Sequence, residues 1–203
     1  MPYLMTEPTE TGEVMAADGT KLFLRCWRAG EGAGRSGAAL LVHGLGEHGG
    51  RYGHVAKVLN ELGFDVWAHD HRGFGKSAGA RARPSERNSL IEDTKLVFDT
   101  IRNRAASSAP LLLGHSMGGA IVAQAVTGGW ISPRALVLSS PGLTSYINAP
   151  MRALTRGLEL IVPNLAVPHG LPLHTISHDA EVLAQSATDP LNHALITPRV
   201  TMF

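Results

Sequence analysis

A serine at the centre of a Gly-x-Ser-x-Gly pattern is the residue of this 203-residue chain best suited to covalent chemistry. Residues 111–120 read Leu-Leu-Leu-Gly-His-Ser-Met-Gly-Gly-Ala, which places Ser116 in the middle of the pattern. The apolar run before it is typical of a buried parallel strand, and the small residues after it suit a helix packed closely on a sheet. A sharp strand-to-helix turn of this kind, a nucleophile elbow, presents its serine for nucleophilic attack. The alternative is a glycine-rich turn that holds an inert serine.

Two backbone N–H groups are candidates for stabilising the negative charge that such an attack creates. Met117 begins the expected helix, so its N–H has no intrahelical acceptor and is free to donate to an oxyanion. Residues 40–46 form a second apolar strand that ends in His-Gly-Leu-Gly. This turn is expected to bring the Leu45 N–H to the same end of the sheet. The alternative is an ordinary glycine turn, and the pairing of the two motifs argues against it.

Several polar residues flank these two turns. His43, Gly44 and His115 are expected near the site, where orienting hydrogen bonds or packing explain the histidines better than base catalysis does. Asp70 is an acid at the end of another expected strand, where it could serve the site or the local structure; we favour a structural role, with Arg72 as its local partner.

Alternating strand and helix patterns position these motifs. Asp18-Gly19 between two strand-like segments predicts an antiparallel hairpin. Ser89-Leu-Ile-Glu resembles a helix capping box. Strands are expected over 13–16, 21–27, 38–42, 64–68, 111–113 and 135–139, and helices over 55–62, 90–101, 117–127, 151–161 and 179–187. This alternation predicts an α/β fold with a doubly wound, mostly parallel sheet and a functional site at the carboxyl ends of its strands.

Composition and charge exclude several other classes of protein. With 44% hydrophobic residues and a net charge of +1, the composition indicates a globular domain. It gives no sign of the basic stripe that nucleic-acid binding usually requires. The single cysteine, Cys26, excludes an intrachain disulfide. The N-terminal segment has no apolar signal core, and no apolar run approaches the length of about 18 residues that a transmembrane helix needs, so a cytoplasmic location is expected. No metal-ligand pattern is present, and no cofactor is expected.

Four motifs, in this order and spacing, resemble the monoacylglycerol lipase and lysophospholipase branch of the α/β-hydrolases. They read His-Gly-Leu-Gly-Glu-His over 43–48, Arg-Tyr over 51–52, Asp-His-Arg-Gly-Phe-Gly-Lys-Ser over 70–77 and Gly-His-Ser-Met-Gly-Gly over 114–119. The resemblance implies that Ser116 attacks an ester and that the N–H groups of Leu45 and Met117 form the oxyanion hole. It also implies an α/β-hydrolase core over residues 1–142 and, over 143–203, a helical cap and the start of the return to the core.

The same resemblance leaves the catalytic serine without partners. In the family a catalytic acid and a histidine follow two further strands beyond the cap, so we expect this chain to halt before either residue, with the last strands of the fold missing. An alternative is that one of four later histidines substitutes for the base, with Asp179 or Asp189 as the acid; these histidines are His169, His174, His178 and His193. An apolar strand edge is then expected around 136–138, which is an aggregation hazard.

The function expected from these observations is a serine ester hydrolase that acts on monoacylglycerol, lysophospholipid or a similar single-chain ester. Its partner is a small acyl ester, with peripheral contact with lipid as a further expectation. Apolar residues of the cap are expected either to line an acyl pocket or to form the core face of the cap helices; they are Leu154, Leu158, Leu160, Ile161, Val162 and Leu165. The alternatives are an inactive form that only binds acyl ligands, and a thioesterase or peptidase on the same scaffold.

Overall fold

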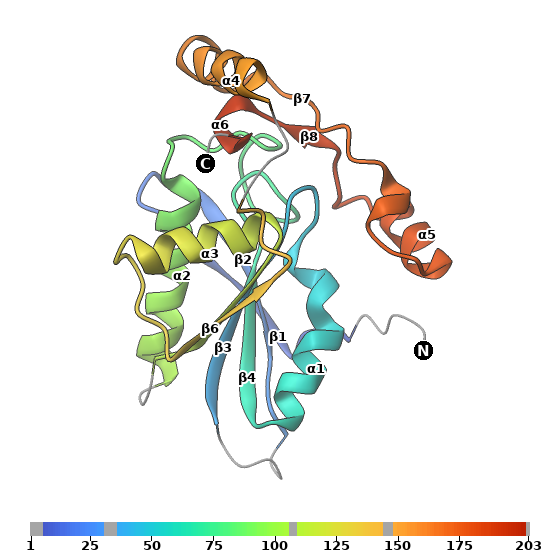
Figure 1. Ribbon diagram of the computed structural model, residues 1–203. Helices are drawn as coiled ribbons and strands as arrows, with labels where there is room; N and C mark the ends of the chain where they lie inside the picture. The colour runs from blue at the N-terminus through green and yellow to red at the C-terminus, as the bar shows by residue number, and fades with distance from the viewer. Residues whose placement is uncertain (1–5, 31–35, 106–108, 144–147, 202–203) are drawn as a thin grey trace.

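The computed structural model describes residues 6–30, 36–105, 109–143 and 148–201, and its centre is a six-stranded sheet (Figure 1). The strand order is β1-β2-β4-β3-β5-β6. The strands are β1 Glu10–Met15, β2 Lys21–Trp27, β3 Gly37–Val42, β4 Phe64–His69, β5 Leu111–His115 and β6 Ala135–Ser139. The four strands from β4 to β6 are parallel, and β1 and β2 add an antiparallel pair at one edge. The expected doubly wound, mostly parallel sheet is therefore confirmed.

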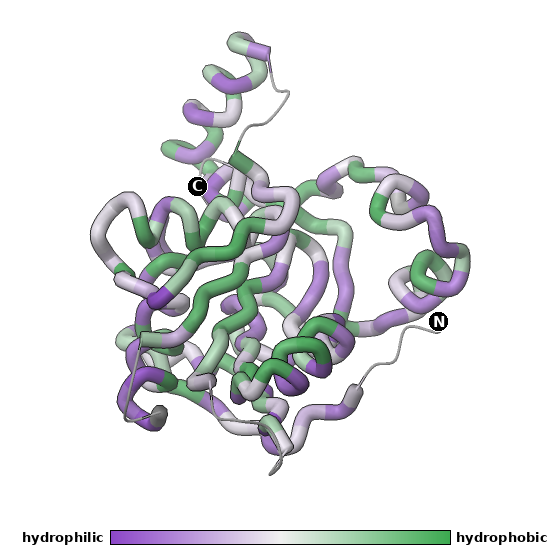
Figure 2. Tube along the Cα trace, turned by 60° about the horizontal axis from the view of Figure 1, so that its bottom comes forward, coloured by the Kyte–Doolittle hydropathy of each residue, from purple (hydrophilic) through white to green (hydrophobic). Residues whose placement is uncertain are grey.

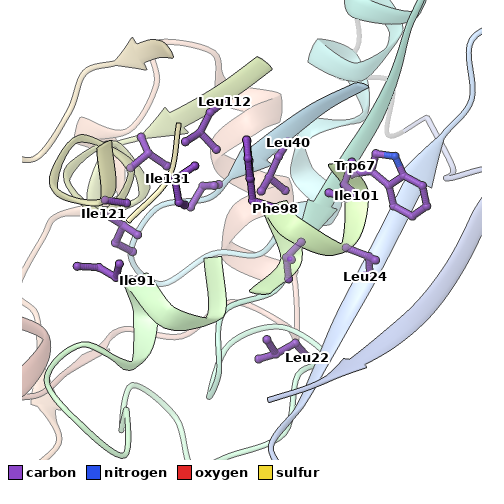
Figure 3. Packing of buried hydrophobic residues seen from close by; sticks show 14 of the residues in the cluster. Leu22, Leu24, Leu40, Trp67, Ile91, Phe98, Ile101, Leu112, Ile121 and Ile131 are labelled. Carbon is purple, nitrogen blue, oxygen red and sulfur yellow. The ribbon is translucent and has the colours of Figure 1, made fainter. Parts of the chain in front are cut away.

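Helices cover both faces of this sheet. Helices α2 (Ser89–Ala105) and α3 (Met117–Thr127) pack on one face, and α1 (Gly53–Glu61) packs on the other, after the short helix η1 (Gly49–Tyr52). The apolar positions of α2 and α3 meet the side chains of the central strands in one cluster, part of which Figure 3 shows. Its labelled members are Leu22, Leu24, Leu40, Trp67, Ile91, Phe98, Ile101, Leu112, Ile121 and Ile131. This cluster fixes the strand ends that carry the candidate site.

Residues 148–201 form a separate group of short elements above the strands' carboxyl ends (Figure 1). They are helix α4 (Ala149–Ile161), strand β7 (Val167–Pro168), helix η2 (Leu173–Thr175), helix α5 (Ala180–Thr188), strand β8 (Leu195–Ile196) and helix α6 (Pro198–Thr201). Several hydrogen bonds tie this group to the core; among them, the His193 N–H donates to the Gly46 carbonyl (3.0 Å), and the Thr197 hydroxyl donates to the Ala82 carbonyl (2.8 Å). The expected division between core and cap at residue 142 stays a prediction, because residues 144–147 lie outside the described part of the chain.

Helix α4 does not bury the apolar residues that the sequence assigned to a pocket or a cap core. Leu154, Leu160 and Ile161 are 55%, 86% and 79% exposed. Figure 2 shows α4 projecting from the body of the protein at the top of the view, with hydrophobic and hydrophilic residues mixed along it. The described residues therefore leave an apolar surface on this helix.

Strand β6 lies at the other edge of the sheet. It pairs with β5 on one side, and no described strand pairs with its other side. Val137 and Leu138 are 41% and 38% exposed, so the apolar edge expected around 136–138 is present. No helix in the described ranges is long and apolar enough to cross a membrane.

Candidate active site

Ser116 occupies a sharp turn between β5 and α3. Its backbone has φ of 52° and ψ of −119°, a left-handed conformation that is strained for any residue with a side chain. The Ser116 N–H donates to the Ser139 carbonyl at the end of β6 (3.0 Å), and the Ser116 carbonyl accepts from Gly142 (2.8 Å) and Ala120 (3.1 Å). The end of β6 and the first turn of α3 thus hold the strained backbone in place.

Close backbone contact at Gly118 joins this elbow to strand β3. A Cβ atom added at Gly118 would clash with the Val42 carbonyl oxygen and lie 2.5 Å from the His43 carbonyl oxygen. Both obstacles are backbone atoms at a buried strand end, so neither can move aside. Only glycine fits here, which explains the small residues that follow Ser116.

Gly118→Ala is expected to lower the free energy of unfolding by about 3 kcal/mol, because the methyl group must displace the end of β3. Urea denaturation measures this change. The matched control is Gly157→Ala in α4, where an added Cβ meets nothing within 4 Å. There the replacement removes the helix penalty of glycine and should stabilise by about 0.5–1 kcal/mol. Equal effects of the two replacements would contradict the close contact at Gly118.

The loop after β3 lies against the elbow. A Cβ atom at Gly44 would lie 3.2 Å from Ser116 Cβ, so the His-Gly-Leu-Gly turn and the serine are in direct proximity, as the two motifs predicted. Within the described residues, neither the Leu45 N–H nor the Met117 N–H has a hydrogen-bond acceptor. Both candidate donors are thus available to a ligand.

The Glu47 carboxylate organises this loop from the inside. Its Oε1 accepts from the Gly44 N–H (2.7 Å) and from the Tyr52 hydroxyl (2.6 Å), and its Oε2 accepts from the Arg51 guanidinium (2.7 Å). Sequence reasoning assigned Glu47 no role. The only signal for this role in the sequence is an acid three residues after Gly44. Arg51 and Tyr52 give no such signal, because helix η1 is what brings their side chains to Glu47.

His43 is fully buried and uses both ring nitrogens within the protein. Nδ1 donates to the Gly44 carbonyl (2.8 Å), and Nε2 accepts from the His71 N–H (2.9 Å). Burial lowers the pKa of His43 well below its usual value, and the neighbouring His71 lowers it further. His43 therefore favours the neutral form, and both of its ring nitrogens are occupied by bonds to the backbone. The orienting role expected from the sequence stays a prediction.

The His115 side chain also bonds within the protein. Its Nδ1 forms a hydrogen bond with the Ser139 hydroxyl (3.0 Å) at the end of β6. The residue precedes Ser116 in the elbow, as expected, and its side chain links β5 to β6.

Asp70 holds the far side of the same loop. Its Oδ1 accepts from the Arg25 guanidinium (2.5 Å) and the Gly49 N–H (2.8 Å), and its Oδ2 accepts from the Lys76 N–H (2.8 Å). The structural interpretation of Asp70 agrees with these contacts, but the expected partner was wrong. Arg72 instead forms a two-bonded pair with Asp93 and a further bond with Asp18.

No histidine among the described residues forms a hydrogen bond with the Ser116 hydroxyl. His169 and His193 lie beside Gly46, and the Nδ1 atom of each accepts a backbone N–H two residues further along the chain. Asp189 accepts from the His48 Nε2 (2.8 Å), and Asp179 caps helix α5. These contacts give no support to a substitute base and acid drawn from residues 148–201.

A cavity of about 340 Å³ separates the Leu45 turn from the segment above it. Leu45, Gly46 and Glu47 form its floor, and residues from the segment 169–194 complete its wall.

In the described ranges, no group of three or more histidine, cysteine, aspartate or glutamate side chains is arranged to hold a metal ion.

Comparison with known proteins identifies the family of this arrangement. The family model described as "Serine aminopeptidase, S33" matches residues 34–203. The monoacylglycerol lipase of Mycolicibacterium smegmatis is 33% identical over 159 residues, which cover 77% of this chain and 56% of that protein. The human monoglyceride lipase is 33% identical over 180 residues, covering 85% of this chain and 55% of that protein.

A solved structure gives the same result. The crystal structure of the Paleococcus ferrophilus monoacylglycerol lipase is 33% identical, with a TM-score of 0.76, and the match covers 89% of this chain and 67% of that one. The chain spans about half the length of the curated relatives it matches. The elbow at Ser116, the adjoining His-Gly-Leu-Gly turn and the match over residues 34–203 together show that the chain belongs to this family of α/β-hydrolases.

Proposed function

We propose that the gene product containing this chain is a serine ester hydrolase whose nucleophile is Ser116. The observation that carries the proposal is the strained Ser116 backbone, held at the carboxyl ends of the strands and in contact with the His-Gly-Leu-Gly turn. Ala82 and Ser140 also have positive φ, but Ser116 alone of the three lies in the Gly-x-Ser-x-Gly pattern. Strained non-glycine residues cluster at active sites, which supports a functional role for this serine. The names of the relatives, which are lipases of single-chain glycerides, support ester chemistry.

In the proposed mechanism the Ser116 Oγ attacks the ester carbonyl carbon while a base removes its proton. The carbonyl oxygen becomes an oxyanion, which the N–H groups of Leu45 and Met117 stabilise. Collapse of this intermediate breaks the bond to the alcohol, which leaves with a proton, and an acyl group remains on Ser116. Water then attacks the acyl-enzyme and releases the fatty acid. The base and its orienting acid belong, in this proposal, to the portion of the longer relatives that this chain does not match.

The substrate we propose is a monoacylglycerol, a lysophospholipid or a similar single-chain ester. Leu45, whose N–H is a proposed oxyanion donor, is one of the residues that line the cavity of about 340 Å³. The exposed apolar residues of α4 offer a surface for peripheral contact with lipid, which would bring such a substrate to the site. An acyl-binding protein without turnover is the alternative, and a peptidase is a second one, favoured by the description of the family model.

Turnover of monoacylglycerol, lysophospholipid, thioester and aminoacyl-peptide substrates by the full-length gene product separates these candidates. Ester hydrolysis should dominate, and Ser116→Ala should reduce kcat by about 10⁴–10⁶-fold. Ser132→Ala, a change at an exposed serine, is the matched control and should retain full activity. Faster cleavage of the peptides than of the esters, or full ester turnover by Ser116→Ala, would refute the proposal. Tight acyl binding without any turnover would favour the alternative of a binding protein.

A further inference from the structure

Both peptide groups that flank Gly44 are held by side-chain hydrogen bonds. In the peptide that precedes Gly44, the N–H donates to Glu47 Oε1 (2.7 Å) and the His43 carbonyl lies 3.2 Å from His71 Nε2. In the peptide that follows, the Gly44 carbonyl accepts from His43 Nδ1 (2.8 Å). The second peptide also contains the Leu45 N–H, the proposed oxyanion donor. A bond to its carbonyl therefore acts on the donor itself.

The planarity of the peptide links the two groups. Since the described chain contains no cis peptide bond, the Gly44 carbonyl and the Leu45 N–H point in opposite directions within one rigid plane. A bond that fixes the direction of the carbonyl also fixes the direction of the N–H. Glycine at position 44 leaves the backbone freer than any other residue would, so this orientation needs an external constraint.

Only one tautomer of His43 can supply this constraint. A carbonyl oxygen can only accept, so Nδ1 must carry the proton. Nε2 must then be the acceptor, and it accepts the backbone N–H of His71 (2.9 Å). The ring is fully buried, so water cannot replace either bond. The His71 backbone thus selects the tautomer of His43, and His43 fixes the peptide.

We propose that His43 is a positioning residue that aims the Leu45 N–H at the oxyanion. The proposal rests on the function proposed above, and it explains why a histidine that takes no part in proton transfer stands at the start of the turn. Preorganised donors stabilise a transition state because they need no reorientation during the reaction. A misdirected Leu45 N–H should therefore reduce kcat and leave substrate binding nearly unchanged.

Two replacements of His43 in the full-length gene product separate positioning from a merely structural role. The amide of His43→Asn reaches the place of Nδ1 and can still donate to the Gly44 carbonyl. The amide of His43→Gln reaches the place of Nε2 and can bond only the His71 N–H. Each variant keeps one of the two buried bonds, so we expect comparable melting temperatures. We expect kcat to fall less than about 10-fold for His43→Asn and about 10²–10³-fold for His43→Gln, with KM little changed.

Equal loss of kcat in the two folded variants, or wild-type kcat in His43→Gln, would overturn the proposal. If neither variant folds, the ring ¹⁵N chemical shifts of His43 in the wild-type protein decide the matter. A proton on Nδ1 supports the proposal, and a proton on Nε2 overturns it. The Ser116→Ala variant separates a failure of the proposed function from a failure of the role proposed for His43. Full activity of Ser116→Ala would refute the proposed function. An inactive Ser116→Ala variant together with a fully active His43→Gln variant would refute only the role of His43.

Discussion

Asp70→Asn is expected to lower the free energy of unfolding by about 3–5 kcal/mol, because it breaks a buried ion pair and leaves one charge uncompensated. Asp70 is fully buried and its partner Arg25 is 4% exposed. The replacement also weakens the bonds to the Gly49 and Lys76 N–H groups, which hold the loop beside the candidate site. Since whole domains are stable by only about 5–15 kcal/mol, this single change should remove much of the stability.

Chemical denaturation with urea measures the effect, and Asp99→Asn is the matched control. Asp99 on α2 is also an ion-paired aspartate, with Lys95 and Arg102 as its partners. All three of these side chains are partly exposed to water. Exposed pairs of this kind contribute at most about 1 kcal/mol. An Asp70→Asn variant as stable as Asp99→Asn would show that the buried pair contributes little to stability.

Acidification from pH 7.5 to pH 5 is expected to destabilise the protein. His43, His69 and His71 are fully buried, and burial lowers the pKa of each; for His71 it falls from 6.5 to about 4. The unfolded chain binds protons on these histidines below pH 6.5, whereas the folded chain does not. The stability that these histidines contribute is therefore fully present above pH 6.5 and is lost as the pH falls, for His71 by about 1.4 kcal/mol per pH unit until the pH reaches about 4.

At pH 5 His71 alone should remove about 2 kcal/mol, and the lowered pKa values of His43 and His69 act in the same direction. His69→Phe tests this expectation directly, because both ring nitrogens of His69 are buried without a hydrogen-bond partner among the described residues. Comparison of the free energies of unfolding at pH 7.5 and pH 5 should show a smaller loss for this variant than for the wild type. His178→Gln, at an exposed position, should change neither value. Identical acid sensitivity of His69→Phe and the wild type would contradict the assignment.

The elements that local patterns define were predictable from the sequence. Apolar runs, a hairpin turn signal and helical spacing predicted β1 to β6 and α1 to α3, because each of these patterns reflects the burial or the turn of a single element. The elbow at Ser116 was equally predictable, since the glycines around it are required by contacts within a few residues and with the neighbouring strand.

The partners of charged residues were not predictable in the same way. Arg72 binds Asp93 and Asp18, which are 21 and 54 residues away in the sequence, and no local pattern points to either of them. The capping box expected at Ser89 also failed, because its hydroxyl accepts from the Glu86 N–H, which precedes the helix. Such contacts depend on how the elements pack, which periodicity does not encode.

The most direct test of the central claim is to locate the site of covalent modification after a fluorophosphonate probe reacts with the full-length gene product. Mass spectrometry of the digested protein identifies the modified residue. We predict a single adduct on Ser116, formed rapidly in the wild type and absent from Ser116→Ala. An adduct on another serine, or undiminished labelling of Ser116→Ala, would contradict the assignment of Ser116 as the nucleophile.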